Sequence, residues 1–219
     1  MKKIISFSLW GENPKYTIGA IENVKLAQTI YSDWICRFYI GKSVPDDIWD
    51  TLDSFNNTEL IDMEESGDWT GMFWRFYPAS ENDVDVFIVR DTDSRLNQRE
   101  KSAVDEWLNS DKGLHIMRDH PYHTSLIMGG MWGMKKGTFP KMKDLIKVYN
   151  KGNFWQVDQN FLNTFVYPLI KDNTFIHDEF TNFENWKKPF PTIRVNKEFV
   201  GDVFDENNQR HPEYYTHIK

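Results

Sequence analysis

Short apolar runs alternate with amphipathic stretches through the first two thirds of the chain. The run Lys3–Leu9 is rich in β-formers and ends at a turn around Gly11 and Pro14, which predicts a buried first strand. From Tyr16 to Tyr31 apolar residues recur every three or four positions, which predicts a helix packed by one face. The same reasoning predicts strands at 34–40, 59–63, 84–89 and 114–117, and helices at 46–55 and 97–108.

This alternation of strands and helices predicts an α/β fold. Strands joined by helices at this spacing form a mostly parallel, mixed sheet that helices cover on both faces. We expect one domain over residues 1–219, with a core to about residue 178 and an irregular segment, 179–219, that wraps it. Ligands of such sheets bind outside the carboxyl ends of the strands.

Composition narrows the function classes. The chain has 26 Lys and Arg against 33 Asp and Glu, a net charge of -7 without a basic run, which argues against a nucleic-acid partner. The single cysteine, Cys36, allows no disulfide within the chain and favours a reducing, cytoplasmic location. The N-terminal apolar run is too short for a signal peptide, and no transmembrane segment is expected.

The sequence Asp91-Thr92-Asp93 directly follows an apolar strand pattern. Two carboxylates one residue apart at a strand end can face the same hard cation, and Mg²⁺ or Mn²⁺ prefers such carboxylates together with substrate phosphates. A solvated acidic turn is the alternative. The buried strand before the motif favours a metal-binding or ligand-binding site.

Other polar residues stand out against apolar surroundings. Arg75 lies in an aromatic run, where it can bind phosphate or pack across the rings. Residues 117–123 contain two histidines, an arginine and an aspartate, a set that suits a polar ligand better than structural zinc. Gly129 and Gly130 allow a ligand to approach the backbone, or form a bulge.

Two later positions complete the candidates. Asp158 and Gln159 begin a helical pattern, so Asp158 is a helix cap or a residue that faces the site. His177 ends a short apolar run, where it could complete a metal site begun by two aspartates or be structural.

Four motifs follow one another along the chain: Asp91–Asp93, Gly129–Gly130, Asp158–Gln159 and His177. Their order resembles that in GT-A-fold glycosyltransferases of the glycogenin and lipopolysaccharide galactosyltransferase type. The sequences RDTDSRLNQREKSAVDEWL, HIMRDHPYH and MGGMWG further resemble small glycosyltransferase domains of bacteria and large DNA viruses. The resemblance covers about residues 3–178, although the glycine pair lacks the Asn of the family's Asn-x-Gly.

The resemblance implies roles for individual residues. Asp91, Asp93 and His177 would hold Mn²⁺ or Mg²⁺, while Asp158 and Gln159 would face the reacting carbon. Asp158 would be the base or electrostatic stabiliser there, with Asp119 as the alternative residue for that role. The donor-binding residues that it implies are Ser8, Leu9, Trp10, Tyr16, Arg75, Asp91, Thr92, Asp93, Arg118, His120, Gly129 and Gly130.

The implied function is metal-dependent transfer of a sugar from a nucleotide-sugar donor, most commonly a UDP-sugar, to a glycan or other hydroxyl acceptor. The Asp-Gln pair favours retention of configuration. One alternative is a haloacid-dehalogenase-like phosphatase, but its aspartate motif normally lies near the N-terminus and an Asp-Asp pair follows it. Another alternative is a carbohydrate-binding domain without activity.

Overall fold

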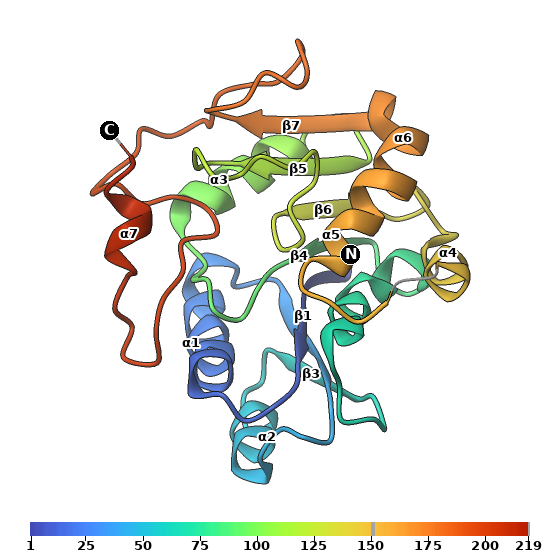
Figure 1. Ribbon diagram of the computed structural model, residues 1–219, viewed down its shortest axis with the longest axis vertical. Coiled ribbons are helices and arrows are strands. Elements are labelled where there is room, and N and C mark those ends of the chain that lie inside the picture. Colours follow the sequence, from blue (N-terminus) through green and yellow to red (C-terminus); the bar gives the residue numbers. More distant parts are fainter. Residues whose placement is uncertain (150–151, 219) are drawn as a thin grey trace.

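A computed structural model describes residues 1–149 and 152–218. Its centre is a seven-stranded sheet with the order β3-β2-β1-β4-β6-β5-β7 (Figure 1). Strand β6 is antiparallel to β4 and β5, and the other pairings are parallel, so the predicted mostly parallel mixed sheet is confirmed. The strands are β1 (Lys3–Leu9), β2 (Ile35–Ile40), β3 (Thr58–Asp62), β4 (Val86–Val89), β5 (Leu114–Arg118), β6 (Trp132–Lys135) and β7 (Thr174–Asp178).

Helices cover both faces of the sheet. Helices α1, α2 and α3 pack on the face that includes Ile5 and Phe7 of β1, whereas η1, α4 and α5 pack on the face that includes Ile4. The helices are α1 (Pro14–Ile30), α2 (Asp46–Asp53), α3 (Gln98–Leu108), α4 (Met142–Val148), α5 (Val157–Phe161), α6 (Tyr167–Ile170) and α7 (Pro212–Tyr215), with 3₁₀ helices η1 (Trp69–Ser80) and η3 (Lys171–Asn173) and π-helical η2 (Leu162–Val166).

The alternation of side chains along β1 also positions η1. Ser6 Oγ donates a hydrogen bond to the carbonyl oxygen of Arg75 at 2.8 Å, and the Arg75 amide donates to Ser8 Oγ at 3.1 Å. Both serines are buried, so these two bonds satisfy polar groups inside the core. The polar positions of β1 therefore fix the place of Arg75 at the carboxyl end of the sheet.

One element had no secondary structure predicted for it, and another begins later than the resemblance implies. The aromatic run that contains Arg75 forms η1, because it has no helical period of apolar residues and carries Pro78 inside. The glycine-containing strand that the family resemblance implies near Gly129 and Gly130 begins only at Trp132. The glycines lie in the turn before β6, where the chain passes beside the end of β4.

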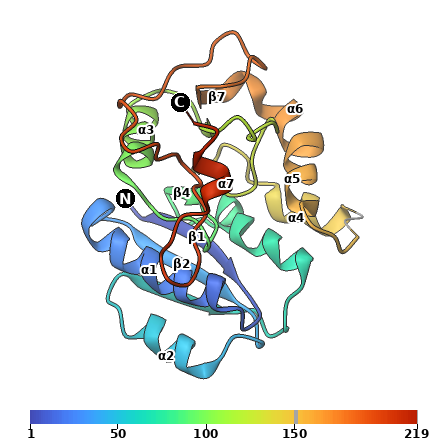
Figure 2. The same ribbon diagram turned by 60° about the vertical axis from the view of Figure 1, so that its left-hand side comes forward.

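The C-terminal segment crosses the carboxyl side of the sheet. Figure 2 shows it running from β7 to α1 and then turning back to α7. Its Asn208 bonds both Glu22 of α1 and Arg95, and the Phe204 amide donates to the carbonyl oxygen of Asp93 at 2.8 Å. The segment therefore contacts the acidic turn that follows β4.

Two further features concern the chain as a whole. Cys36 of β2 is fully buried, and burial raises the pKa of its thiol to about 12. Among the helices of the described residues, none is both long and apolar enough to cross a membrane.

Candidate active site

A cavity of about 610 Å³ opens at the carboxyl ends of β1 and β4. Cavities of about 300–1,000 Å³ are typical of small-molecule sites. Most of the residues expected in the site lie in its wall. These are Ser8, Leu9, Trp10, Tyr16, Arg75, Asp91, Thr92, Asp93, Gly129, Gly130, Asp158 and Gln159.

Helix α1 holds the acidic turn in place. The amide of Asn23 donates to the carbonyl oxygens of Thr92 and Ser94 at 3.3 and 2.8 Å, and Asn23 Oδ1 accepts from the Leu96 amide. A Cβ at Gly19 would lie 2.1 Å from the carbonyl oxygen of Thr92, so the helix can approach this closely only with glycine there. The turn is therefore a fixed structure rather than a solvated loop.

Arg75 joins the acidic turn to the start of α5. Its guanidinium forms an ion pair with Asp91 through Nη1 and with Asp158 Oδ2 through Nη2 at 2.8 Å. Burial acts to lower the pKa of Arg75, but Asp91 and Asp158 outweigh it and raise the pKa. The pKa of Asp158 is raised by burial, which Arg75 partly offsets. Arg75 therefore stays charged between two carboxylates.

Asp93 lies beside a second cation. Its Oδ2 pairs with Lys15 Nζ at 2.8 Å, and Lys15 also lies over the ring of Tyr16. Burial and the charge of Asp91 raise the pKa of Asp93, with Lys15 opposing them. A carboxylate whose pKa is raised by a neighbouring carboxylate forms with it a pair of oxygen ligands that a divalent cation would stabilise.

The acidic pair fits a divalent ion that takes some of its ligands from the protein and the others from a substrate. Among residues 1–149 and 152–218, no three or more His, Cys, Asp or Glu side chains converge on a metal position. Asp91 and Asp93 can thus supply two ligands, and phosphate oxygens are the usual further partners of Mg²⁺ in such sites.

Gln159 also holds the glycine turn. Gln159 Oε1 accepts from the Gly129 amide at 3.2 Å, and its Nε2 donates to Ser125 Oγ at 2.9 Å. Asp158 Oδ1 accepts from the Gln159 amide at 2.8 Å. Both side chains are buried in the wall of the cavity, so this part of the site is preorganised.

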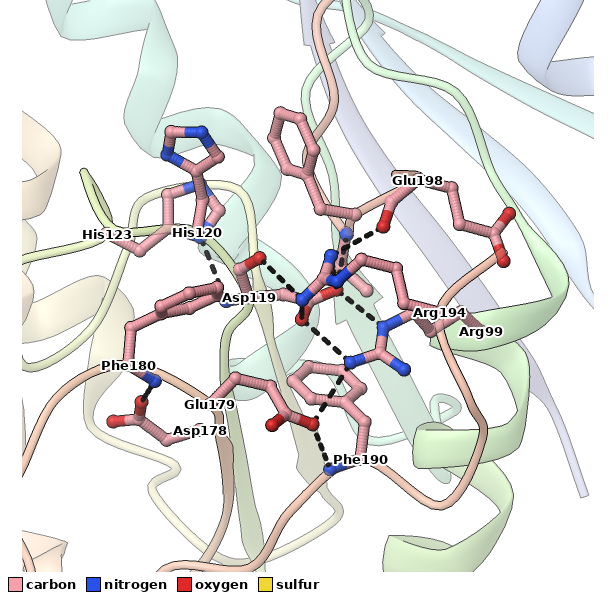
Figure 3. A network of polar contacts seen from close by, with 12 residues as sticks. Arg99, Asp119, His120, His123, Asp178, Glu179, Phe180, Phe190, Arg194 and Glu198 are labelled. Atoms are coloured by element: carbon pink, nitrogen blue, oxygen red, sulfur yellow. Dashed lines mark hydrogen bonds and ion pairs between the residues drawn. The ribbon is translucent and has the colours of Figure 1, made fainter. Parts of the chain in front are cut away.

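The structure does not place Arg118, Asp119 and His120 in the wall of the cavity. Asp119 is fully buried between the guanidinium groups of Arg99 and Arg194 (Figure 3). Arg118 is buried in ion pairs with Asp178 and Glu184.

His120 uses both ring nitrogens in contacts with the backbone. Its Nε2 donates to the carbonyl oxygen of Tyr214 and its Nδ1 accepts from the Tyr122 amide. Together with the ion pairs of Arg118 and Asp119, these contacts correct the expectation that the three residues lie at the donor sugar. They tie the C-terminal segment and β7 to the core.

The structure does not bring His177 to the acidic pair either. Strand β7 lies three positions from β4 in the sheet, about 14 Å at the usual strand spacing. The ring of His177 is fully buried and bonds His115 at 2.9 Å and Glu106 at 3.2 Å. The structure therefore does not place this histidine beside Asp91 and Asp93.

Other cavity residues were missed by the sequence reasoning. Trp69 and Trp155 line it and are exposed, and Gly201 and Val203 come from the C-terminal segment. Asn23, which does not line the cavity but holds the acidic turn, was also missed; it had a signal, since it is polar on the face of α1 that also carries Ala20, Val24 and Ala27. The four cavity residues had no local signal, because their place depends on how the chain folds over the sheet. His123, a further lining residue, was noted only as part of its loop.

Comparison with known proteins gives similarity at the level of the fold. No protein-family model matches the sequence, and no curated protein matches it. A glycosyltransferase involved in glycosylation of the major capsid of PBCV-1 superposes with a TM-score of 0.54 at 17% identity, over 81% of this chain and 82% of that chain.

Two further solved structures have similar scores. The galactosyltransferase LgtC, solved with donor and acceptor sugar analogs, has a TM-score of 0.53 at 10% identity, over 81% of this chain and 73% of that one. The 4-diphosphocytidyl-2C-methyl-D-erythritol synthase from Anaerococcus prevotii has a TM-score of 0.51 at 11% identity, over 87% and 93%. The predicted GT-A-like fold is thus confirmed, and the chain shares this fold with both glycosyltransferases and nucleotidyltransferases.

Proposed function

We propose that the protein is a metal-dependent glycosyltransferase that moves a sugar from a nucleotide-sugar donor, a UDP-sugar in the first instance, to a hydroxyl of a glycan. One observation carries the proposal. Arg75 links the acidic turn after β4 to Asp158 at the start of α5, inside a cavity at the carboxyl ends of the strands. This is where a sheet of this kind binds its ligands.

Asp91 and Asp93 are the residues that would hold Mn²⁺ or Mg²⁺. When bound, such an ion neutralises the negative charge that develops on the departing nucleoside diphosphate. Lys15 and Arg75 already compensate part of the carboxylate charge in the free protein. We expect both pairs to loosen when ion and diphosphate bind together.

The remaining walls suit the other parts of the donor. Leu9, Trp10 and Tyr16 offer apolar and aromatic surface for a base at the end of β1. Gly130 brings backbone next to the Asp91 carboxylate, where the diphosphate and sugar would lie. Asp158 would stabilise the positive charge that develops at the sugar carbon, and Arg75 keeps it in place.

Retention of the sugar's configuration is our proposal for the stereochemistry. Its support is that both oxygens of Asp158 already accept hydrogen bonds, Oδ2 from Arg75 and Oδ1 from the Gln159 amide, which disfavours Asp158 as a general base. NMR of the product tests it, because retention gives the anomeric configuration of the donor and inversion gives the opposite one.

The rim of the cavity suits a carbohydrate acceptor. The Trp155 side chain is 66% exposed although it lines the cavity, and Trp69 is 42% exposed. Exposed tryptophans beside a polar cavity offer flat apolar faces of the kind that sugar rings pack on. We expect Trp155→Ala to raise the KM for the acceptor more than the KM for the donor, and equal changes would contradict this placement.

Nucleotidyl transfer is the second candidate, because a cytidylyl-transferring enzyme shares the fold. The charged residues that line the cavity argue against nucleotidyl transfer. Arg75 is the one Lys or Arg among the described residues that line the cavity, against Glu12, Asp91, Asp93 and Asp158. A nucleoside triphosphate carries more charge than a nucleotide sugar, and this wall offers few cations to balance it.

The experiment is a donor screen. We would measure nucleoside diphosphate release from UDP-, GDP- and dTDP-sugars with Mn²⁺ and with chelator, and pyrophosphate release from nucleoside triphosphates with sugar phosphates. The variants are Asp91→Asn/Asp93→Asn and Asp158→Asn, and the matched control is Asp111→Asn, an exposed aspartate outside the cavity.

Glycosyl transfer predicts metal-dependent release of diphosphate from one donor, lost in both site variants and kept in the control. Pyrophosphate release would instead identify a nucleotidyltransferase. Hydrolysis of a phosphomonoester without donor release would support the phosphatase. Binding of sugars without any turnover would indicate a carbohydrate-binding domain.

A further inference from the structure

His123 is a buried histidine in the wall of the cavity, and no role has yet been given to it. It follows β5 in the same loop as His120 and is one of the residues that line the cavity. The residue is 7% exposed. Phe199 and His120 pack against the ring with centroids 6.0 and 5.5 Å away.

The backbone decides which ring nitrogen carries the proton. The Asp119 amide donates a hydrogen bond to His123 Nδ1 at 3.0 Å. An amide N–H can only donate, so Nδ1 must be the acceptor and cannot carry a proton. The neutral ring then carries its proton on Nε2.

Nε2 is left without a protein partner. Within the described residues Nε2 forms no hydrogen bond, and it is not sealed from solvent. A buried ring with one nitrogen fixed by the backbone and the other unpaired beside a cavity has a donor to offer to a ligand.

We propose that His123 is a ligand-binding residue that donates a hydrogen bond from Nε2 to an oxygen of the nucleotide-sugar donor. The inference rests on the proposed function and assigns a contact that the acidic turn and α5 do not provide. The acceptor is an oxygen of the diphosphate or a hydroxyl of the transferred sugar. Both chemistries accept from a neutral N–H, and the experiment separates them.

The same geometry excludes His123 as a metal ligand. A metal binds the lone pair of a ring nitrogen, but the Nδ1 lone pair is used by the Asp119 amide and Nε2 carries the proton. In agreement, burial and then His120 lower the pKa of His123 to about 3, so the ring stays neutral at physiological pH.

The His123 ring, which would donate this hydrogen bond, is also fixed in its position. Asp119, whose amide fixes the ring, is bound through its carboxylate to Arg99 at 2.8 Å, to Arg194 at 2.6 Å and to the Val200 amide at 3.0 Å (Figure 3). Because these contacts join α3 and the C-terminal segment to one loop, the ring loses little freedom when a ligand binds.

The test compares His123→Phe with the wild type and with His211→Phe, an exposed histidine outside the cavity. Calorimetry with Mn²⁺ present measures the affinity for UDP, GDP and dTDP and for their hexose conjugates. We expect an affinity loss of about three- to tenfold for a lost neutral hydrogen bond, and more for a charged acceptor. Loss for nucleotide and conjugate alike places the contact on the diphosphate, and loss for the conjugate alone places it on the sugar.

A second measurement does not depend on the variant. Long-range ¹H–¹⁵N NMR of histidine-labelled wild type should show a neutral ring protonated on Nε2, with a shift when the nucleotide conjugate is added. A ring protonated on Nδ1, or a loss of Mn²⁺ affinity in His123→Phe, would overturn the inference. Unchanged affinities with a binding-competent wild type would overturn it alone, whereas a wild type that binds no nucleotide would overturn the proposed function as well.

Discussion

Gly130 leaves no room for a side chain beside Asp91. A Cβ built there would lie 1.9 Å from Asp91 Oδ2, and one at Gly129 would lie 2.9 Å from Asp158 Oδ2. The glycine pair therefore does more than form a turn, because it lets the chain just before β6 approach both carboxylates. At the scale of single residues, the site is defined by such close approaches.

We predict that Gly130→Ala lowers donor turnover about 100-fold, since displacement of a catalytic group by an ångström costs about that much. The measurement is steady-state release of nucleoside diphosphate. The double variant Asp91→Ala/Gly130→Ala should be no slower than Asp91→Ala alone, because both changes act on one carboxylate. Additive losses would show that Gly130 acts elsewhere.

Titration of the Asp202 carboxyl makes the free energy of unfolding depend on pH. It is 3% exposed and pairs with Arg210, and its Oδ1 has no partner among the described residues. Burial raises its pKa from 3.8 to about 6, with Arg210 opposing the rise. The folded state thus favours the protonated carboxyl, and the stability that this contributes below pH 3.8 is lost as the pH rises through about 6.

We therefore predict that Asp202→Asn gains stability relative to the wild type as the pH rises from 4 to 7, by on the order of 3 kcal/mol. Urea unfolding at fixed pH values measures it, with the exposed Glu206→Gln as the charge-matched control. A difference between Asp202→Asn and wild type that does not change with pH would contradict the assignment.

At the scale of elements, one buried carboxylate joins three segments. Asp119 follows β5 and binds Arg99 of α3 and both Arg194 and Val200 of the C-terminal segment. Removal of one partner from a buried ion pair leaves uncompensated charge, which costs about 3–5 kcal/mol. These contacts hold the C-terminal segment directly before Gly201 and Val203, which line the cavity.

Asp119→Asn should lower the melting temperature by about 10 °C, from the loss above and a few degrees per kcal/mol for a chain of this size. Limited proteolysis should then cut within residues 190–200 sooner than in the wild type or in Asp111→Asn. An unchanged melting temperature, or cleavage that begins elsewhere, would show that this network does not hold the segment.

The elements were largely predictable, and the partners of charged residues were not. Periodicity marked β1, α1 and α3 because apolar burial acts over a few neighbouring positions. Asp119 and Arg194 pair across 75 positions, so their local pattern could not tell a catalytic aspartate from a structural one. The acidic turn and Asp158 were recognised because their motifs follow element boundaries.

At the scale of the whole molecule, the cavity is built by distant parts of the chain. Its wall takes Trp10 from the end of β1, Trp69 from η1, Asp91 from the acidic turn, Asp158 from α5 and Val203 from the C-terminal segment. A ligand that contacts all of them stabilises the folded state as a whole.

We predict that UDP with Mn²⁺, at a hundred times the dissociation constant, stabilises the protein by about 2.7 kcal/mol. For a chain of this length the melting temperature should rise by roughly 5–10 °C. Hydrogen exchange should slow in residues 10–16 and in 199–204 together. Protection of one of these segments without the other would show that the C-terminal segment does not contact the nucleotide.

The thiol of Cys36 gives a practical advantage. It is the sole sulfhydryl, it is fully buried in β2, and its raised pKa keeps it protonated. A maleimide dye or spin label will therefore attach to a cysteine introduced on the surface, such as at Glu206, while the native thiol stays unmodified. Movement of the C-terminal segment can thus be followed by fluorescence without first removing any native residue.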